Sequence, residues 1–229
     1  MAIVCDVPAL FFTLAPGTGS TALEEYLMQP SVQILLGSRK VPDMGCEIPS
    51  WLDKKHCTYK QAVSADIGVI EGMTVVTGTR NPFDYWYAEW FRHRHRWIKE
   101  LGNRDSWVFK NANKMETIRD CCLYGFSEWV LRYHKQRKAA DDEATAMLHP
   151  QYLIEAAHTL RMESIQQDLH SVLAHQLGHE ITDKLPDMSK VNVTPRSESD
   201  AYWQHYSPEA RDMITHYYSD HLRLFGYHF

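Results

Sequence analysis

The stretch from Met73 to Thr79 constrains the fold of this chain more than any other. It is rich in β-branched residues and carries no charge, as expected for a strand that is buried on both faces. Asn81 and Pro82 follow it, and they fit the cap and the first position of a helix. The aromatic residues after Pro82 recur at helical spacing and mark one face of that helix. The stretch therefore predicts a central strand that leads into a long helix.

A second strand-turn-helix unit stands near the N-terminus. An apolar run from Ala9 to Leu14 predicts a strand, and a turn from Pro16 to Thr21 separates it from apolar residues at helical spacing. Further strands are expected at 32–36 and 158–162, and further helices at 116–134, at 165–177 and from Ser207 to His221. Because strands and helices alternate, the sequence predicts an α/β fold with a mostly parallel central sheet flanked by helices.

Length and composition set the class of protein. The chain has 229 residues, of which 44% are hydrophobic and 23% are charged, which fits one globular domain spanning 1–229. Its net charge of −5 argues against a nucleic-acid-binding protein. No apolar stretch is long enough to span a membrane, and the N-terminus lacks the features of a signal peptide. We therefore expect a cytoplasmic protein with reduced cysteines that binds neither membranes nor nucleic acid.

The turn from Pro16 to Thr21 has the composition of an anion-binding loop. Its backbone N–H groups and the N-terminus of the following helix suit a phosphate group, and Thr18, Ser20 and Thr21 add hydroxyl donors. The turn ends without the Gly-Lys-Ser/Thr of a Walker loop, and it lacks the dinucleotide fingerprint. A turn that merely caps a helix accounts for this composition equally well.

Arg80 is a second candidate for binding an anion. It stands at the end of the central strand, where open α/β sheets bind their ligands. A guanidinium group can hold a phosphate through two hydrogen bonds. For Arg80 taken alone, an ion pair with Asp84 at the start of the helix is the simpler alternative.

Taken together, these stretches resemble the sulfotransferases that use 3′-phosphoadenosine 5′-phosphosulfate (PAPS), particularly the carbohydrate-type and bacterial members. In that family a Gly-, Ser- and Thr-containing loop holds the 5′-phosphosulfate. An Arg-Asn-Pro-Phe/Trp-Asp segment, here 80–84, leads into the helix that holds the 3′-phosphate. The resemblance extends along nearly the whole chain. It includes Lys55-His56-Cys57-Thr58, His149 to Leu153, Arg161 to Ile165 with Asp168-Leu169, Asn192-Val193-Thr194, Tyr206, and the ending from Asp220 to Tyr227.

The resemblance implies a P-loop-like nucleotide-binding fold and a set of site residues. PAPS would be the sulfuryl donor and 3′-phosphoadenosine 5′-phosphate (PAP) the product, with no metal. The acceptor would be a hydroxyl or an amine of a small molecule or carbohydrate. Arg80 and Arg196 would bind the 3′-phosphate, although Arg196 is equally well interpreted as an exposed loop residue. The residues that would hold the 5′-phosphosulfate are Gly17, Thr18, Gly19, Ser20 and Thr21.

Two positions depart from the family pattern. Gly17 stands where the family loop usually has Lys or Arg, and Ala88 stands where the family helix usually has a Ser that binds the 3′-phosphate. Losing a cation beside developing charge typically costs a few kcal/mol of transition-state stabilisation. Lys55 is the first candidate for a substitute cation, ahead of Arg39, Lys40 and Lys54.

His56 is the predicted general base. Sulfuryl transfer is an in-line displacement in which catalysis consists mainly of positioning and electrostatic stabilisation. A base must also take the acceptor's proton, and histidine titrates near neutral pH. The resemblance places an active-site histidine at His56, and Glu47 and Asp53 are the fallback bases.

Other patterns give weaker indications. The basic tract from Arg92 to Arg96 continues the helix that begins at Pro82, and most of its side chains are expected to be solvated. His175 and His179 have the spacing of two metal ligands on one helical face, but a surface pair is the better interpretation. The rival functions are a non-catalytic relative that only binds the nucleotide and, far lower in rank, a kinase that uses ATP and Mg²⁺.

Overall fold

The structure is a computed structural model, and the contacts between its residues divide the chain into two compact units. The first unit is Met1–Arg80 with Ala144–Asn192, and the second is Asn81–Glu143 with Val193–Phe229. Each unit is described by itself, and the expectation of one domain over 1–229 stays a prediction. The residues that the structure describes are 3–13, 15, 17–27, 33–36, 58–64, 70–138, 153, 156–178 and 200–229.

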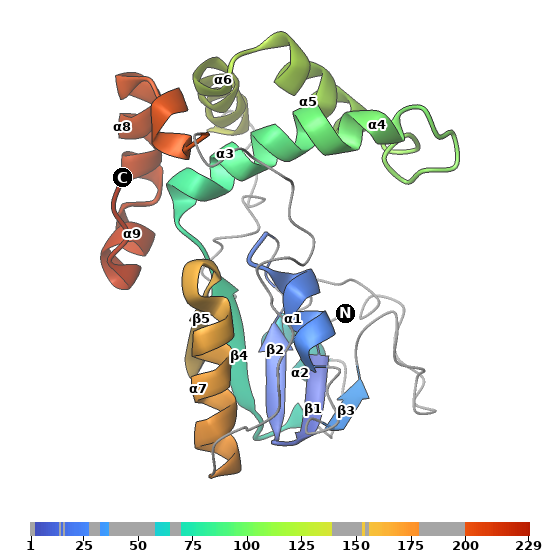
Figure 1. The fold of residues 1–229 in the computed structure, drawn as a ribbon, viewed down its shortest axis with the longest axis vertical. Helices are drawn as coiled ribbons and strands as arrows, with labels where there is room; N and C mark the ends of the chain where they lie inside the picture. The colour runs from blue at the N-terminus through green and yellow to red at the C-terminus, as the bar shows by residue number, and fades with distance from the viewer. Residues whose placement is uncertain are drawn as a thin grey trace. The chain divides into compact units, whose positions relative to one another are not determined.

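The first unit is built on a five-stranded sheet with the strand order β3-β1-β2-β4-β5 (Figure 1). The strands are β1 (Ile3–Val7), β2 (Leu10–Thr13), β3 (Gln33–Leu36), β4 (Thr74–Thr79) and β5 (His158–Arg161). β2, β4 and β5 are parallel to one another, and β1 is antiparallel to both of its neighbours. β1 therefore runs against the other four strands, and the expected mostly parallel sheet is confirmed for the described part of the chain.

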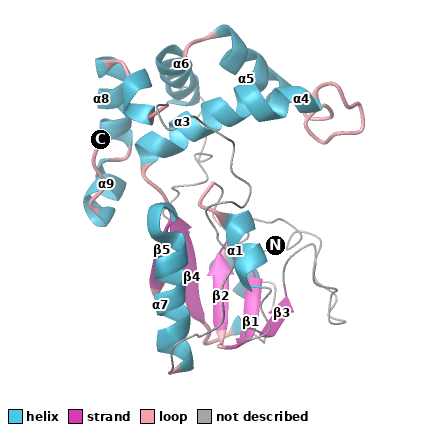
Figure 2. Ribbon diagram, in the orientation of Figure 1, coloured by secondary structure: helices cyan, strands magenta, loops and turns pink. Residues whose placement is uncertain are grey.

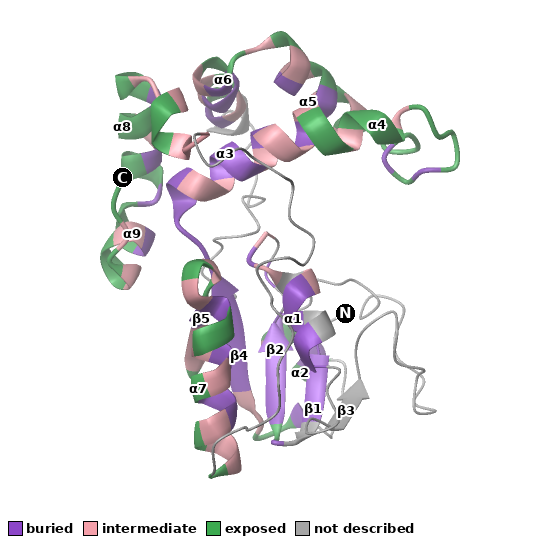
Figure 3. Cartoon of the chain, viewed as in Figure 1, coloured by how far each residue is buried: buried purple, intermediate pink, exposed green. Residues whose placement is uncertain are grey.

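Helices cover both faces of this sheet, and α1 and α7 are seen in front of it in Figure 2. On one face, α1 (Ser20–Leu27) and α7 (Ile165–Leu177) bury leucines against Phe12 of β2 and Val76 of β4. On the other face, α2 (Tyr59–Val63) buries Ala62 in a cluster with Phe11 of β2 and Val75 of β4. Each of these two residues immediately precedes Phe12 or Val76 in its strand. Neighbouring residues of a strand point to opposite faces, so an apolar run without charge is what a sheet covered on both sides requires. Burial follows the same pattern, with β4 almost entirely buried (Figure 3).

The second unit is helical in its described residues. Asn81 accepts the backbone N–H of Phe83 at 3.0 Å, and Pro82 occupies the first turn of α3. The predicted start of this helix is therefore confirmed. The helices are α3 (Pro82–Arg92), the π-helix η2 (His93–Trp97), α4 (Ile98–Glu100), α5 (Ala112–Leu123), α6 (Phe126–Lys138), the 3₁₀ helix η6 (Tyr202–His205), α8 (Pro208–Tyr217) and α9 (Ser219–Phe225).

Two predicted helices are wrong in their extent. The single helix expected over 116–134 is two helices, because Tyr124 adopts an extended conformation and Gly125 follows it. The final helix begins after its cap Ser207 as expected but ends at Tyr217, and His221 lies in α9. Apolar spacing alone did not reveal either break, since it continues across both junctions.

Aromatic side chains form much of the interior of the second unit. Trp86 of α3 lies 5.9 Å, between ring centroids, from Trp129 of α6, and Tyr87 meets Phe126 edge to face at 5.2 Å. These rings explain part of the chain's aromatic content as packing. Among the described residues, no helix is both long enough and apolar enough to cross a membrane.

Candidate functional site

The connection between β2 and α1 forms a tight glycine-dependent turn. We call residues 17–21 the glycine loop. Gly17 and Gly19 have φ angles of 76° and 82°, a conformation that glycine adopts without strain and other residues rarely adopt. α1 begins immediately afterwards, at Ser20. The first N–H groups of a helix have no partner within the helix, so this turn has the backbone chemistry expected for an anion site.

Close packing against two other segments fixes the glycine loop. A Cβ atom on Gly78 of β4 would lie 2.4 Å from Oγ1 of Thr18, and one on Gly19 would lie 2.6 Å from Sδ of Met162. Both distances are too short for real contacts, so glycine is required at each position unless neighbours move. β4 and the turn after β5 therefore hold the glycine loop against the end of the sheet.

The side chain of Thr18 stabilises the glycine loop itself. Thr18 is 3% exposed, and its hydroxyl donates a hydrogen bond of 2.8 Å to the carbonyl oxygen of Ala15. A hydroxyl has one proton to donate, so this proton is engaged within the turn. The expected contact between the Thr18 hydroxyl and an anion therefore stays a prediction. Thr21 lies half-buried in the first turn of α1, and the side chain of Ser20 lies outside what the structure describes.

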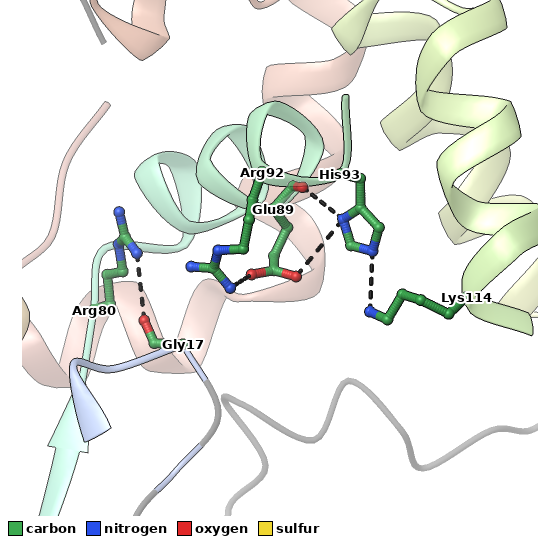
Figure 4. Close-up of polar contacts among 6 residues, drawn as sticks. All are labelled: Gly17, Arg80, Glu89, Arg92, His93 and Lys114. Atoms are coloured by element: carbon green, nitrogen blue, oxygen red, sulfur yellow. Dashed lines mark hydrogen bonds and ion pairs between the residues drawn. The ribbon is translucent and has the colours of Figure 1, made fainter. Parts of the chain in front are cut away.

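Arg80 reaches the glycine loop from the end of β4. It is 8% exposed, and its Nη1 donates a hydrogen bond of 3.3 Å to the carbonyl oxygen of Gly17 (Figure 4). The structure thus brings together two features that are 63 positions apart in sequence. A buried guanidinium beside the N-terminus of a helix adds to the positive potential there. The Arg80–Gly17 contact joins the two parts of the candidate site that the structure describes.

The other residues singled out from the sequence lie away from the glycine loop in the chain or outside the described residues. Ala88 is buried in α3 of the second unit. His175 lies in the last turn of α7, with its ring 6.0 Å from that of His158, whereas His179 lies outside the described residues. No group of three or more residues suited to hold a metal occurs in the described part of the chain. The other predicted site residues outside the described ranges are Lys55, His56, Arg196, Glu47, Asp53, Arg39, Lys40 and Lys54.

A second polar cluster, in the second unit, was missed by sequence reasoning. We call Glu89, Arg92, His93 and Lys114 the Lys114 cluster (Figure 4). Arg92 pairs with the carboxylate of Glu89, and Nζ of Lys114 lies 3.0 Å from Nε2 of His93. Most side chains of the basic tract were expected to be solvated: His95 and Arg96 are exposed, Arg92 and Arg94 are half-buried, and His93 is 3% exposed.

Burial dominates the electrostatics of the Lys114 cluster. It lowers the pKa of His93 to about 4, with Glu89 opposing this effect and Lys114 adding to it. Burial also lowers the pKa of Lys114 to about 8, again opposed by Glu89 and reinforced by Arg92. Both nitrogen bases therefore hold protons less strongly than they do in water.

A third cluster attaches η6 to α3. The hydroxyl of Tyr87 donates to Oδ1 of Asp200 at 2.6 Å, and Nε2 of His205 lies 2.6 Å from the same oxygen. The rings of Tyr87 and His205 stack at 4.6 Å, and Ser127 donates to the backbone of His205 at 2.7 Å. These contacts serve to hold the segment after Asp200 against the helices.

Comparisons with protein-family models, with curated proteins and with solved structures find no match to this chain.

Proposed function

We propose that the protein is a sulfotransferase with a P-loop-like nucleotide-binding fold that transfers a sulfuryl group from PAPS to a hydroxyl or an amine. The observation that supports this proposal most is the hydrogen bond between buried Arg80 and Gly17. It joins a cation at the carboxyl end of a parallel strand to a glycine-dependent turn before a helix. Phosphate groups of nucleotides bind at such strand ends in α/β proteins.

The proposed reaction is an in-line displacement at sulfur. The acceptor oxygen or nitrogen forms a bond to sulfur as the bond from sulfur to the bridging phosphate oxygen breaks. The acceptor loses its proton to a base, which we propose is His56, and PAP leaves with the negative charge. Backbone N–H groups of the glycine loop would stabilise that charge, and Lys55 would assist them.

Arg80 is also our candidate for the cation that the glycine loop lacks. Gly17 offers no charged side chain, and its φ of 76° is one that Lys or Arg rarely adopts. The guanidinium of Arg80 lies at the carbonyl of this same residue. We therefore propose that Arg80 interacts with the 5′-phosphosulfate and does not serve the 3′-phosphate alone.

The second candidate function is nucleotide binding without catalysis. The absence of a cationic side chain at Gly17 is the observation that favours it, because binding tolerates such a loss better than transition-state stabilisation does. Turnover of PAPS with any acceptor would exclude this alternative.

Calorimetric titration tests the proposed nucleotide site. The ligands are PAP, AMP, which lacks the 3′-phosphate, and ATP with Mg²⁺, and the proteins are the wild type, Arg80→Met and Arg161→Met. Arg161 ends the neighbouring strand β5 but is exposed, so it controls for the general charge at this edge. We expect PAP to bind in the micromolar range and Arg80→Met to weaken it by about 100-fold, the size typical of a lost buried charged contact. Arg161→Met should change it by less than about threefold.

The comparison between PAP and AMP assigns Arg80 to one end of the nucleotide. If Arg80 contacts the 5′ group, Arg80→Met weakens the binding of AMP as well as that of PAP. If it contacts only the 3′-phosphate, AMP binding is unchanged and the preference for PAP disappears. A folded wild-type protein that binds no PAP, or that prefers ATP with Mg²⁺, would overturn the proposal.

A further inference from the structure

The amine of Lys114 lies between an imidazole and two indoles. Lys114 belongs to α5, and its Nζ is 3.0 Å from Nε2 of His93. The same atom lies 3.8 Å from the ring centroid of Trp97 and 5.8 Å from that of Trp107. Trp97 and Trp107 meet edge to face at 5.9 Å. The imidazole of His93 is thus a hydrogen-bond partner of Lys114, and the two indole rings form an apolar surface beside its amine.

The hydrogen bonds of His93 define its protonation. Its Nδ1 lies 2.6 Å from the backbone carbonyl oxygen of Glu89, which can only accept a hydrogen bond, so Nδ1 carries the ring proton. Because burial lowers the pKa of His93 to about 4, the ring is neutral at pH 7. Nε2 is then a bare acceptor, and Lys114 must donate to it. His93 therefore fixes the direction of one N–H of the amine (Figure 4).

The charged groups around Lys114 do not hold it in the protonated form. Glu89 and Arg92 face it from α3, His93 faces it from η2, and Cys121 lies on its own helix. Arg92 already pairs with the carboxylate of Glu89, so the nearest negative charge is shared with a second cation. Burial of the amine outweighs the remaining attraction and lowers its pKa to about 8. A substantial fraction of the amine is therefore neutral near pH 7.5.

A π-helix presents the partners of Lys114. In η2 the N–H of Ile98 bonds to the carbonyl of His93, five residues back, and the rings of His93 and Trp97 lie 4.4 Å apart. Single π-turns inside α-helices occur frequently at functional sites. Trp107, which follows in the next loop, is 58% exposed. More than half of the surface of Trp107 is thus open to solvent in this unit.

We propose that Lys114 is a nucleophilic amine that forms a Schiff base with an aromatic aldehyde or ketone held against Trp97 and Trp107, with His93 as a positioning residue. The lone pair of the neutral amine attacks the carbonyl carbon, the C=O electron pair moves to oxygen, and one N–H proton passes to that oxygen to give a carbinolamine. The hydroxyl then leaves with the second N–H proton as water, and the nitrogen lone pair forms the C=N bond. Because one N–H points at His93, the lone pair points away from the ring. This site is independent of the proposed sulfotransferase activity.

Reductive trapping tests the proposal. Full-length protein is incubated with benzaldehyde and sodium cyanoborohydride, which reduces an imine to a stable secondary amine, and labelled lysines are mapped by peptide mass spectrometry. Lys99 and Lys110, both exposed, are internal controls in the same sample. We expect labelling of Lys114 at pH 7.5 to be about tenfold faster than at either control. The rate at Lys114 should reach half its maximum near pH 8, and protein unfolded in guanidinium should lose the preference.

Two variants separate reactivity from a structural role. Lys114→Arg should abolish the preferred label while leaving the controls unchanged. His93→Phe keeps a ring beside Trp97 but removes the acceptor, and it should slow labelling of Lys114 by severalfold relative to Lys99. Labelling of wild-type protein in proportion to exposure, or a half-maximal rate near pH 10, would overturn the proposal even if His93→Phe fails to fold. An unchanged rate ratio in folded His93→Phe would overturn the role of His93.

Discussion

The glycine loop of the first unit and the Lys114 cluster of the second are built by opposite means. The glycine loop consists of backbone groups, and its shape follows from two glycines with positive φ and from a third, Gly78, that leaves room for Thr18. The Lys114 cluster consists of side chains from α3, η2 and α5, joined by burial and hydrogen bonds. The glycine loop therefore depends on which residues are small, whereas the cluster depends on which residues are excluded from water.

This difference predicts different responses to pH and to substitution. Backbone N–H groups do not titrate in the working range, so the glycine loop should be indifferent to pH. The Lys114 cluster contains two nitrogen bases with lowered pKa values, so its contribution to stability must change with pH. Substitutions that add volume should destabilise the glycine loop more than the Lys114 cluster, because the glycine loop has no room for larger side chains.

The largest expected effect is the acid sensitivity contributed by His93. Its folded pKa is about 4, below the value of about 6.5 for the unfolded chain. Between these values the unfolded state binds more protons, so the free energy of unfolding decreases as the pH falls from 6.5 to 4. A shift of this size corresponds to roughly 3 kcal/mol as an upper bound. Urea unfolding of wild type and His93→Phe across this pH range measures the difference.

His95→Phe is the matched control for that experiment, because His95 is an exposed histidine of the same π-helix. Its pH profile should parallel that of the wild type. If His93→Phe retains the full loss of stability between pH 6.5 and pH 4, the buried histidine is not its source.

The next effect is steric and concerns the glycine loop. In Gly78→Ala the new Cβ would lie 2.4 Å from Oγ1 of Thr18 and 3.1 Å from its backbone oxygen. Overpacking of this kind typically costs about 2 kcal/mol. Gly102→Ala is the control, since its Cβ would make an ordinary contact of 3.5 Å with the oxygen of Lys99. Thermal melts should show a lower Tm for Gly78→Ala at every pH tested, and equal melts for the two variants would mean that the turn adjusts freely.

The two regions also differ in how far the sequence predicts them. The turn before α1 and the strand 74–79 were predictable because local composition carries the information: glycines mark the turn, and uncharged β-branched residues mark a buried strand. The helix boundaries at Tyr124 and Tyr218 were not predictable from apolar spacing, because the spacing continues across both. The sequence analysis assigned Arg80 and Gly17 to the same nucleotide-binding site, but it did not predict the direct contact between them.

The Lys114 cluster was missed for a physical reason. A run of five residues that alternates Arg and His looks solvated, because consecutive residues of a helix point in all directions around it. His93 stands three residues after Trp90 and seven after Trp86, so it continues the buried face of α3, but the charged neighbours on both sides obscure this signal. Its partner Lys114 stands 21 positions away, and that pairing leaves no local signal in the sequence.

The smallest expected effect is the pH dependence of stability that Lys114 contributes. Stability should rise with pH, whereas a lysine whose charge is stabilised by folding makes stability fall with pH. The folded pKa of Lys114 is about 8, below the value of about 10.4 expected for the unfolded chain. Between these values the unfolded state holds more protons, so stability rises as the pH increases from 8 to 10. Taken in full, this pKa difference corresponds to roughly 3 kcal/mol, and attraction to the Trp97 ring, which favours the charged form, makes the rise smaller than that. In Lys114→Met, which retains the apolar stem, this rise should disappear and stability at pH 7 should equal or exceed that of the wild type. Lys99→Met, at an exposed position, should leave the profile unaltered. A loss of stability at pH 7 in Lys114→Met would instead mean that its hydrogen bond to His93 outweighs the burial of its charge.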